Sequence, residues 1–298
     1  MRYSPPSSAV RRFAILAIIL LLCPHARVSA APLEFQLKLG LGLSELDLGE
    51  LGDLVSAGEQ RAASWVVNGT RTAGDPLPGM GRALDAHGEL IARLSSRLSL
   101  GLEVGINGAT RDGQVGWIES QAGSVRHGVE IRHTVVPVRL NLRYTLGRSR
   151  GLRAYLAAGA GIYPGRIYLW QNTLARDDGE ERMVYFSGRG DGTALGVHLG
   201  AGLRLPISRR FDLFVEMAGQ SVRIGALRGE ATMMDTAVEL NTMTEGTFWL
   251  VTRENESGRF QEVVAAAERP AGPDYLDAVE LGMDLSGLTL RAGLIIRL

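Results

Sequence analysis

Histidines are the side chains of this chain best suited to acid–base chemistry near neutral pH, and four of them follow residue 30. These are His87, His127, His133 and His198. The sequence contains no GxSxG, HExxH, CxxC or His-x-Ser motif, and its single cysteine is Cys23. His133 has Ser124 and Glu130 near it in the chain, but a lone histidine at a strand end is usually a surface polar residue. We therefore predict no catalytic residue, no metal site and no cofactor.

Overall composition narrows the class of protein before any element is placed. Charged residues make up 21% of the 298 residues and the formal net charge is zero, so neither disorder nor a basic surface for nucleic acid is expected. The 38 glycines do not follow a G-X-Y period, which excludes collagen and favours structure rich in strands and turns. We predict no nucleic-acid partner.

The first thirty residues have the pattern of a cleaved export signal. A basic start at Arg2, Arg11 and Arg12 precedes an apolar run over 13–23, and small residues at 28–30 form a cleavage site. Four arginines and no acidic residue lie in 1–30, so the mature chain would carry a net charge of −4 and no cysteine. The sequence thus predicts a signal peptide at 1–30 and one exported domain over 31–298.

Beyond residue 30, apolar and polar residues alternate with a period of two, which predicts β-strands with two different faces. In the segment 33–44, leucines and one phenylalanine alternate with polar residues and glycines. The alternation recurs in 98–107, 136–144, 195–205, 211–217 and 288–298. No run of 18 apolar residues is present, so helical membrane spans are excluded.

The connections between these segments alternate in length. Eight strands are predicted, at 33–44, 87–95, 97–107, 131–146, 152–171, 193–206, 211–227 and 279–298. Three connections are short and polar, whereas four are long, at 45–86, 108–130, 172–192 and 228–277. Short turns on one rim and long loops on the other are typical of outer-membrane barrels. The sequence therefore predicts an all-β fold, a closed antiparallel transmembrane β-barrel of eight strands with long extracellular loops. A hairpin within 247–265 could raise the count to ten, and a soluble sandwich or lipocalin-like barrel is the alternative fold.

The polar faces of these strands carry charges that would point into a narrow lumen. An eight-stranded barrel has room inside only for its own side chains, and charges there must be paired. The predicted lumen-facing network comprises Glu34, Lys38, Glu103, Arg139, Arg143, Arg153, Arg204, Glu216 and Arg291, with His198, Asp212 and Arg297 on the same faces. We expect an arginine–carboxylate network that fills the lumen.

Three segments, 92–105, 156–163 and 284–298, carry a resemblance to the small outer-membrane β-barrel proteins of Gram-negative bacteria, the OmpA/OmpX-like eight-stranded group. The resemblance implies a location in the bacterial outer membrane, with outer-membrane lipids around the barrel. It also implies recognition by the barrel-assembly machinery, which reads an aromatic last residue in most members. This chain ends in Leu298 instead.

Function is expected to reside in the long loops, because binding residues concentrate in loops on rigid scaffolds. We predict a structural or surface-interaction role for an unidentified surface ligand, with a plugged lumen. One alternative is a small channel for apolar or very small solutes, with Pro137 and Pro164 as candidate breaks in strand pairing. The other is a lipid A-modifying enzyme; such barrels use a serine and a histidine near the outer rim, where His133 lies.

Some loop segments have patterns of their own. Residues 46–66 show a patchy helical spacing, Arg189-Gly190-Asp191 matches an adhesion tripeptide, and Asn68-Gly69-Thr70 matches a glycosylation acceptor. The acidic segment 177–181 lacks the spacing of a calcium loop and is more simply a solvated turn.

Overall fold

The described part of the chain folds almost entirely into β-strands. The computed structural model describes residues 34–47, 49, 70–73, 82–119, 123–149, 151–177, 180–237, 239–255, 258–273 and 275–298. The strands are β1 (Glu34–Asp47), β2 (Thr70–Ala73), β3 (Arg82–Arg93), β4 (Leu98–Glu119), β5 (Gly123–Val135), β6 (Val138–Ser149), β7 (Leu152–Asp177), β8 (Glu180–Pro206), β9 (Phe211–Ser221), β10 (Arg223–Ile224), β11 (Arg228–Asp235), β12 (Leu240–Asn255), β13 (Gly258–Ala266), β14 (Tyr275–Glu280), β15 (Met283–Asp284) and β16 (Ser286–Arg297). Within this described part, no helix is long and apolar enough to cross a membrane.

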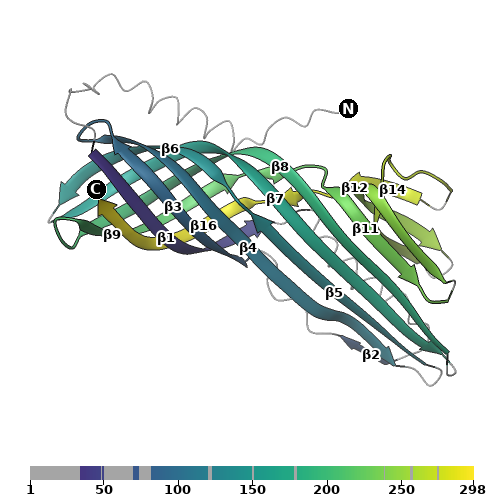
Figure 1. Ribbon diagram of the computed structural model, residues 1–298. Helices are drawn as coiled ribbons and strands as arrows, with labels where there is room; N and C mark the ends of the chain where they lie inside the picture. Colours follow the sequence, from purple (N-terminus) through teal and green to yellow (C-terminus); the bar gives the residue numbers. More distant parts are fainter. Residues whose placement is uncertain are drawn as a thin grey trace.

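Eight strands close into a ring, with every neighbouring pair antiparallel. The order around the ring is β1, β3, β4, β6, β7, β8, β9 and β16, and β16 pairs again with β1. The first and last strands therefore lie side by side, with both described ends of the chain at the rim that holds the short turns (Figure 1). The predicted all-β, closed antiparallel barrel of eight strands is confirmed.

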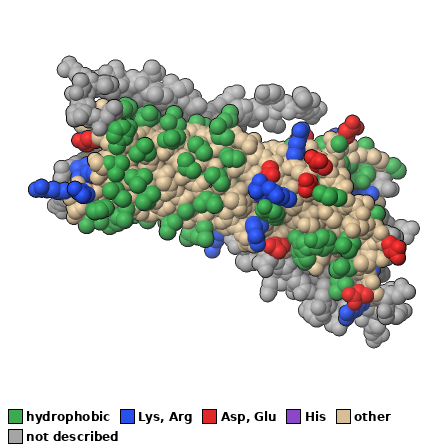
Figure 2. Space-filling model, in the orientation of Figure 1, with side chains coloured by type: hydrophobic (Ala, Val, Ile, Leu, Met, Phe, Trp, Pro, Cys, Tyr) green, Lys and Arg blue, Asp and Glu red, His purple; other side chains and the backbone are tan. Residues whose placement is uncertain are grey.

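The period of two sorts the ring strands into an apolar outer face and a polar inner face. On β1, Leu41 is 71% exposed, whereas Lys38 on the opposite face is completely buried. We call the outward side chains of the ring the apolar band; among its exposed members are Leu39, Leu41, Leu43, Leu84, Leu90, Leu100, Leu102, Val104, Ile106, Leu140, Ile162, Leu195, Leu203, Val215, Met217, Leu288 and Leu290. Figure 2 shows this band on one face of the barrel end of the molecule, with charged side chains beyond its edge.

One predicted strand, 131–146, is interrupted in the structure. It divides into β5 and β6 at Val136 and Pro137, because proline cannot donate to the ladder. The two pieces remain in line, since β6 pairs with the first half of β4 and β5 with its second half. Backbone hydrogen bonds continue across the break, from Gly105 N to the Pro137 oxygen (3.0 Å) and from Val136 N to the Pro164 oxygen (2.9 Å). The sheet is therefore continuous at both prolines.

Two of the predicted long loops are strand hairpins. The segment 108–130 is occupied largely by the end of β4 and the start of β5, and 172–192 by the β7–β8 hairpin. The strands β7 and β8 have 26 and 27 residues. At ~3.3 Å per residue each extends over roughly 85 Å, far more than the ~10 residues that a membrane-spanning strand needs. The sheet thus continues well beyond the barrel (Figure 1).

The last long connection, 228–277, adds strands to this extension. β11 pairs with the outer half of β8, and β12 pairs with β11, β13 and β14. The hairpin expected within 247–265 is present as β12 and β13, but it joins the sheet outside the ring. We call β2, β11 to β14 and the outer parts of β4, β5, β7 and β8 the outer sheet. The ring itself has eight strands.

Between the barrel and the outer sheet, the chain turns inward twice. The predicted strand 211–227 ends at Ser221, and the final strand begins at Ser286 rather than near 279. Directly after the first of these points and before the second, β10 and β15 form a short antiparallel pair. The predicted signal peptide at 1–30, most of the helical pattern in 46–66 and the Asn68-Gly69 part of the acceptor lie outside the described residues.

Candidate functional site

The barrel interior holds a buried cluster of charges at the level of the apolar band. Lys38 from β1 donates to Glu216 of β9 at 2.8 Å and lies 3.6 Å from Glu89 of β3. Arg143 of β6 also donates to Glu89, at 2.7 Å. The Tyr155 hydroxyl donates to Glu216 at 2.8 Å. Side chains from several strands thus converge on two carboxylates.

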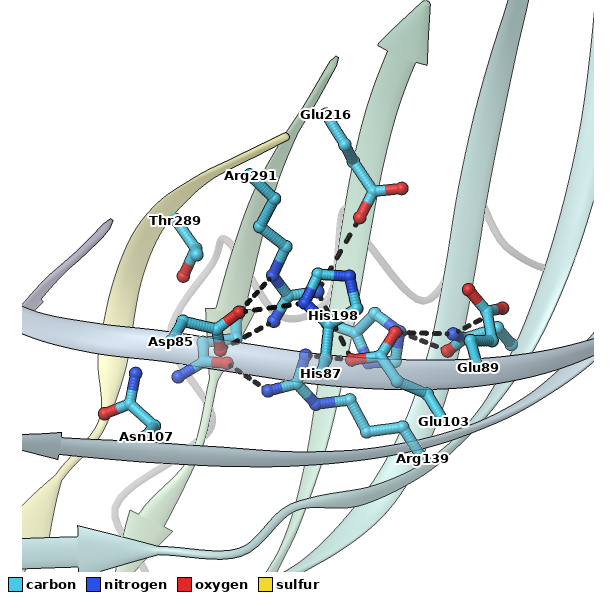
Figure 3. Close-up of polar contacts among 12 residues, drawn as sticks. Asp85, His87, Glu89, Glu103, Asn107, Arg139, His198, Glu216, Thr289 and Arg291 are labelled. Carbon is cyan, nitrogen blue, oxygen red and sulfur yellow. Dashed lines mark hydrogen bonds and ion pairs between the residues drawn. The ribbon is translucent and has the colours of Figure 1, made fainter. Parts of the chain in front are cut away.

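A second centre lies next to it and is shown in Figure 3. Arg139 donates to Glu103 at 2.9 Å, and Arg291 donates to the same Glu103 oxygen at 3.3 Å. Arg291 also forms an ion pair with Asp85, with Nε 2.9 Å from Oδ1. His87 Nδ1 lies 3.1 Å from the same Asp85 oxygen. The guanidinium of Arg291 therefore links β3, β4 and β16.

An amide joins the two centres. Asn141 Nδ2 donates to Glu89 and to Glu103, in each case at 3.0 Å, and its oxygen lies 2.6 Å from His198 Nε2. Counting both centres, the basic side chains Lys38, Arg139, Arg143 and Arg291 face the carboxylates Asp85, Glu89, Glu103 and Glu216. We call these eight residues with Asn141 the central network. Its formal charges balance, as burial of ionised groups requires.

Smaller polar groups lie on either side of the central network. Toward the short turns, Arg204 and Arg297 both bind Asp212, which is fully buried. Toward the outer sheet, Asn107 donates to Ser44, which shares a 2.9 Å hydrogen bond with Thr289. The interior therefore changes from charged to neutral polar along the barrel axis.

Above the neutral groups the interior becomes apolar. The turns around β10 and β15 place Val222, Ile224, Leu227, Leu281, Met283 and Leu285 inward, all 2% exposed or less. They pack with residues of β5, β7 and β12, among them Ile131, Ile167 and Phe248. We call this cluster the apolar cap. Glycine on β8 makes room for it, since a Cβ on Gly190 would lie 2.5 Å from the Phe248 ring.

The nine residues predicted for the lumen-facing network do not all lie together in the structure. Lys38, Glu103, Arg139, Arg143, Glu216 and Arg291 lie in the central network. Arg204 lies nearer the short turns, and Arg153 is half-buried on the neighbouring strand. Glu34 is at the rim, where it forms an exposed 2.8 Å ion pair with Arg93. Six of the nine residues are thus brought together.

Sequence reasoning missed three members of the central network, Asp85, Glu89 and Asn141, and gave no place to their neighbour His87. The signal was present, because Asp85, His87 and Glu89 alternate with Leu84, Ala86 and Leu90 in the same period of two. Asp85 fell outside the expected strand 87–95, whereas β3 begins at Arg82. Glu89 lies within the expected strand 87–95, and the alternation along that strand was enough to predict it on the inward face.

The histidine considered for catalysis lies apart from the two residues near it in the sequence. His133 is buried on the inner face of β5, and Glu130, three residues away, is on the opposite face. The backbone of Ser124 lies nine residues along the same strand. Among the described residues, no group of three or more His, Cys, Asp and Glu is arranged to hold a metal ion.

The tripeptide Arg189-Gly190-Asp191 lies within β8, where Arg189 and Asp191 point outward and Gly190 inward. Asp191 is engaged by Arg166 at 2.5 Å. Of the acidic segment 177–181, residues 178 and 179 lie outside the described residues; Glu181 pairs with Arg176 in the β7–β8 register and accepts a hydrogen bond from it at 2.9 Å. The tripeptide is therefore part of a paired strand and not of a loop.

Comparisons with known proteins give structural likeness at low identity. No family model matches the chain, and no curated protein sequence matches it. One similar solved structure is a major outer membrane protein from Thermus thermophilus, with 14% identity, a TM-score of 0.35, and coverage of 90% of this chain and 100% of that chain. Another is the outer membrane protease OmpT from Escherichia coli, with 9% identity, a TM-score of 0.29, and coverage of 91% and 100%. Likeness at this level carries neither protein's activity to this chain.

Proposed function

We propose that this protein is a sealed eight-stranded barrel of the bacterial outer membrane that anchors the outer sheet for contacts at the cell surface. The observation that carries the proposal is the layered interior, in which the central network is followed by the apolar cap. An export signal at 1–30 and membership of the OmpA/OmpX-like eight-stranded group belong to the same proposal.

The apolar band supports insertion in a membrane. Side chains such as Leu41, Leu195 and Leu290 are 60% exposed or more, which a water-soluble barrel would not repeat around its whole circumference. A spanning barrel requires such an outward band, ~25 Å high, with polar residues inside. A closed ring also leaves no unpaired strand edge in the hydrocarbon, as the absence of water there requires. Outer-membrane lipids are thus the expected surroundings, and the barrel-assembly machinery the expected partner for insertion.

The interior supports a structural role in preference to transport. Ions would meet guanidinium and carboxylate groups already held by partners from opposite strands, at Arg291 and Glu103 for example. Beyond them lie side chains such as Leu227 and Leu281, which are completely buried in the apolar cap. We propose that the lumen is plugged, that the protein is not an enzyme, and that it uses no cofactor.

Conductance measurement on planar bilayers tests the proposal. We expect no stable current step above the baseline after insertion of the purified full-length protein. A bilayer without current could also result from protein that did not fold or insert. The same preparation is therefore checked for heat-modifiable migration on gels, which folded barrels show. Stable open-channel steps would overturn the sealed barrel and favour a small channel. Recovery of the protein as a soluble periplasmic species would overturn the membrane location.

The lipid A-modifying alternative has a separate test. Lipid A is profiled after expression of the wild-type chain and of His133→Ala. We expect the same lipid A species in both strains and in the empty-vector control. A new species that depends on His133 would overturn the non-enzymatic proposal.

A further inference from the structure

A hollow in the outer wall lies at the edge of the apolar band. It has a volume of about 460 Å³ and lies across β1, β3, β4 and β5. We call it the rim hollow and define it by Leu43, Arg82, Leu84, Gly108, Arg132 and Thr134. Gly108 pairs with Leu84 on one side and with Thr134 on the other. The wall is therefore thinned where the outward-facing residue of β4 has no side chain.

Two kinds of chemistry meet in the rim hollow. On the barrel side, Leu43 and Leu84 are exposed members of the apolar band. On the side of the outer sheet, Arg82 and Arg132 are the first outward basic residues beyond the band on β3 and β5. Such an arrangement follows the order of a lipid at a membrane surface, with acyl chains below and an anionic headgroup above.

The arginines extend along the same edge. The register places Arg132 opposite Tyr168, and Tyr168 opposite Arg189, in one row across three strands. The guanidinium of Arg189 lies over the Tyr168 ring at 5.8 Å. A tyrosine between two arginines is suited to the interface, since its ring is apolar and its hydroxyl is polar.

Acidic neighbours do not close the site. Glu130 lies 3.4 Å from Arg132, and both side chains are substantially exposed. Glu45 is opposite Arg82 in the β1–β3 register. An exposed ion pair such as that of Arg132 with Glu130 is weak, so an incoming phosphate can replace it. Guanidinium groups bind phosphate with two parallel N–H donors, which makes phosphate the favoured exchange partner.

We propose that the rim hollow binds the phosphate-bearing headgroup of an outer-leaflet lipid, with Arg82 and Arg132 on the phosphate and Leu43 and Leu84 along the first acyl carbons. This inference rests on the proposed function, because it requires the barrel to lie in a membrane with the outer sheet on the outer side. Each interfacial arginine is expected to contribute roughly fivefold to the affinity.

Lipid binding to the purified full-length protein in detergent micelles tests this, with native mass spectrometry as the readout. The probes are diphosphorylated lipid A and the same glycolipid after removal of both phosphates. We expect the phosphorylated form to bind roughly 25-fold more tightly, since each of the two arginines contributes roughly fivefold. The double variant Arg82→Gln/Arg132→Gln should lose most of that preference. The matched control is Arg209→Gln/Arg210→Gln, which removes two exposed arginines from the short-turn rim and should leave it unchanged.

A second variant tests the hollow itself. Gly108→Val fills it, and a Cβ there would lie 3.1 Å from the His133 carbonyl oxygen, so only a small backbone adjustment is needed. We expect weaker binding of the phosphorylated lipid with unchanged heat-modifiable migration.

Three outcomes would overturn the inference: equal affinity for both glycolipids, the same loss in the double variant and its control, or displacement of the lipid by millimolar inorganic phosphate. Failure of the protein to insert in bilayers would instead defeat the proposed function. An inserted protein without phosphate preference would defeat this inference alone.

Discussion

The barrel and the outer sheet share the long strands β4, β7 and β8 but have opposite arrangements of polarity. At the level of the apolar band, the outward side chains are apolar and the inward ones are charged, as Leu41 and Lys38 on β1 show. Beyond the band, the inward side chains Ile131 and Ile167 are buried in the apolar cap, whereas Arg132 and Arg166 point outward. The strands continue without a break in pairing between the two parts. What changes is the medium outside the wall, and the side chains change with it.

Stabilisation therefore has a different origin in each part. The central network is held by charge pairs that are expensive to break, because an unpaired buried charge has no water to solvate it. The apolar cap is held by the burial of apolar surface, at about 25 cal/mol per Å². The following substitutions test this contrast.

The largest effect is expected in the central network. Replacement of Arg291 by methionine removes the cation that Asp85 and Glu103 share. We expect a loss of about 4 kcal/mol in the free energy of unfolding, measured by urea titration in phospholipid vesicles. The control is Arg166→Met, which breaks an exposed ion pair with Asp191 and should leave the urea midpoint nearly unchanged. Equal losses in the two variants would show that the interior charges are solvated.

The next effect compares the outer faces of the two parts. Leu41 in the apolar band and Met243 on the outer sheet are almost equally exposed, at 71% and 69%. Leu41→Arg should cost about 3 kcal/mol in vesicles, because it places a charge in hydrocarbon. Met243→Arg should remain within about 0.5 kcal/mol, because its side chain faces water. If the two variants unfold at the same urea concentration, the band does not lie in the membrane.

A smaller effect is expected in the apolar cap. Ile224→Val removes one methyl group from a side chain that is 1% exposed, and should cost about 1 kcal/mol. Ile162→Val removes the same group from the lipid-facing side of β7 and should have almost no effect. The urea midpoints of the two variants provide the measurement. A larger loss of stability for Ile162→Val than for Ile224→Val would show that the outer side of the wall is packed more tightly than the apolar cap.

The smallest effect is a pH dependence of the outer sheet. Arg182 donates to Asp235 at 2.5 Å, and this hydrogen bond holds the pKa of Asp235 below its usual value. The pairing therefore contributes stability above the unfolded-state pKa of ~3.9. That contribution is lost as the pH falls through the lower, folded-state pKa of Asp235.

We expect limited proteolysis of the β8–β11 region to increase as the pH falls from about 5 to about 2, with a loss of no more than about 1 kcal/mol of local stability. Asp235→Asn should remove this pH dependence. If Asp235→Asn retains the full pH dependence of proteolysis, another carboxylate is responsible for it.

Parts of this architecture could be predicted because they follow from local alternation. The inward positions of Lys38, Glu103 and Arg139 are set by parity within their own strands. Pro137 was named as a candidate break in pairing, although the strand 131–146 was expected to run through it, and the extension of β7 to Asp177 was not predicted. A segment with weak alternation becomes a strand when a neighbouring strand supplies its hydrogen bonds, and that neighbour is remote in the sequence.

By itself, the sequence determined the strand class, the two faces of each strand and the closed eight-stranded barrel, and it identified six residues of the central network. Only the tertiary structure decided which charges meet. Arg291 reaches Asp85 and Glu103 because ring closure and register bring β16 to the same level as β3 and β4. It also decided that the chain near 222–227 and 281–285 turns inward as a cap. Period-two alternation specifies which side a residue faces. Which partner it meets across the lumen depends on the pairing of remote strands, so that Arg291 and Asp85 bind each other although they are 206 residues apart in the sequence.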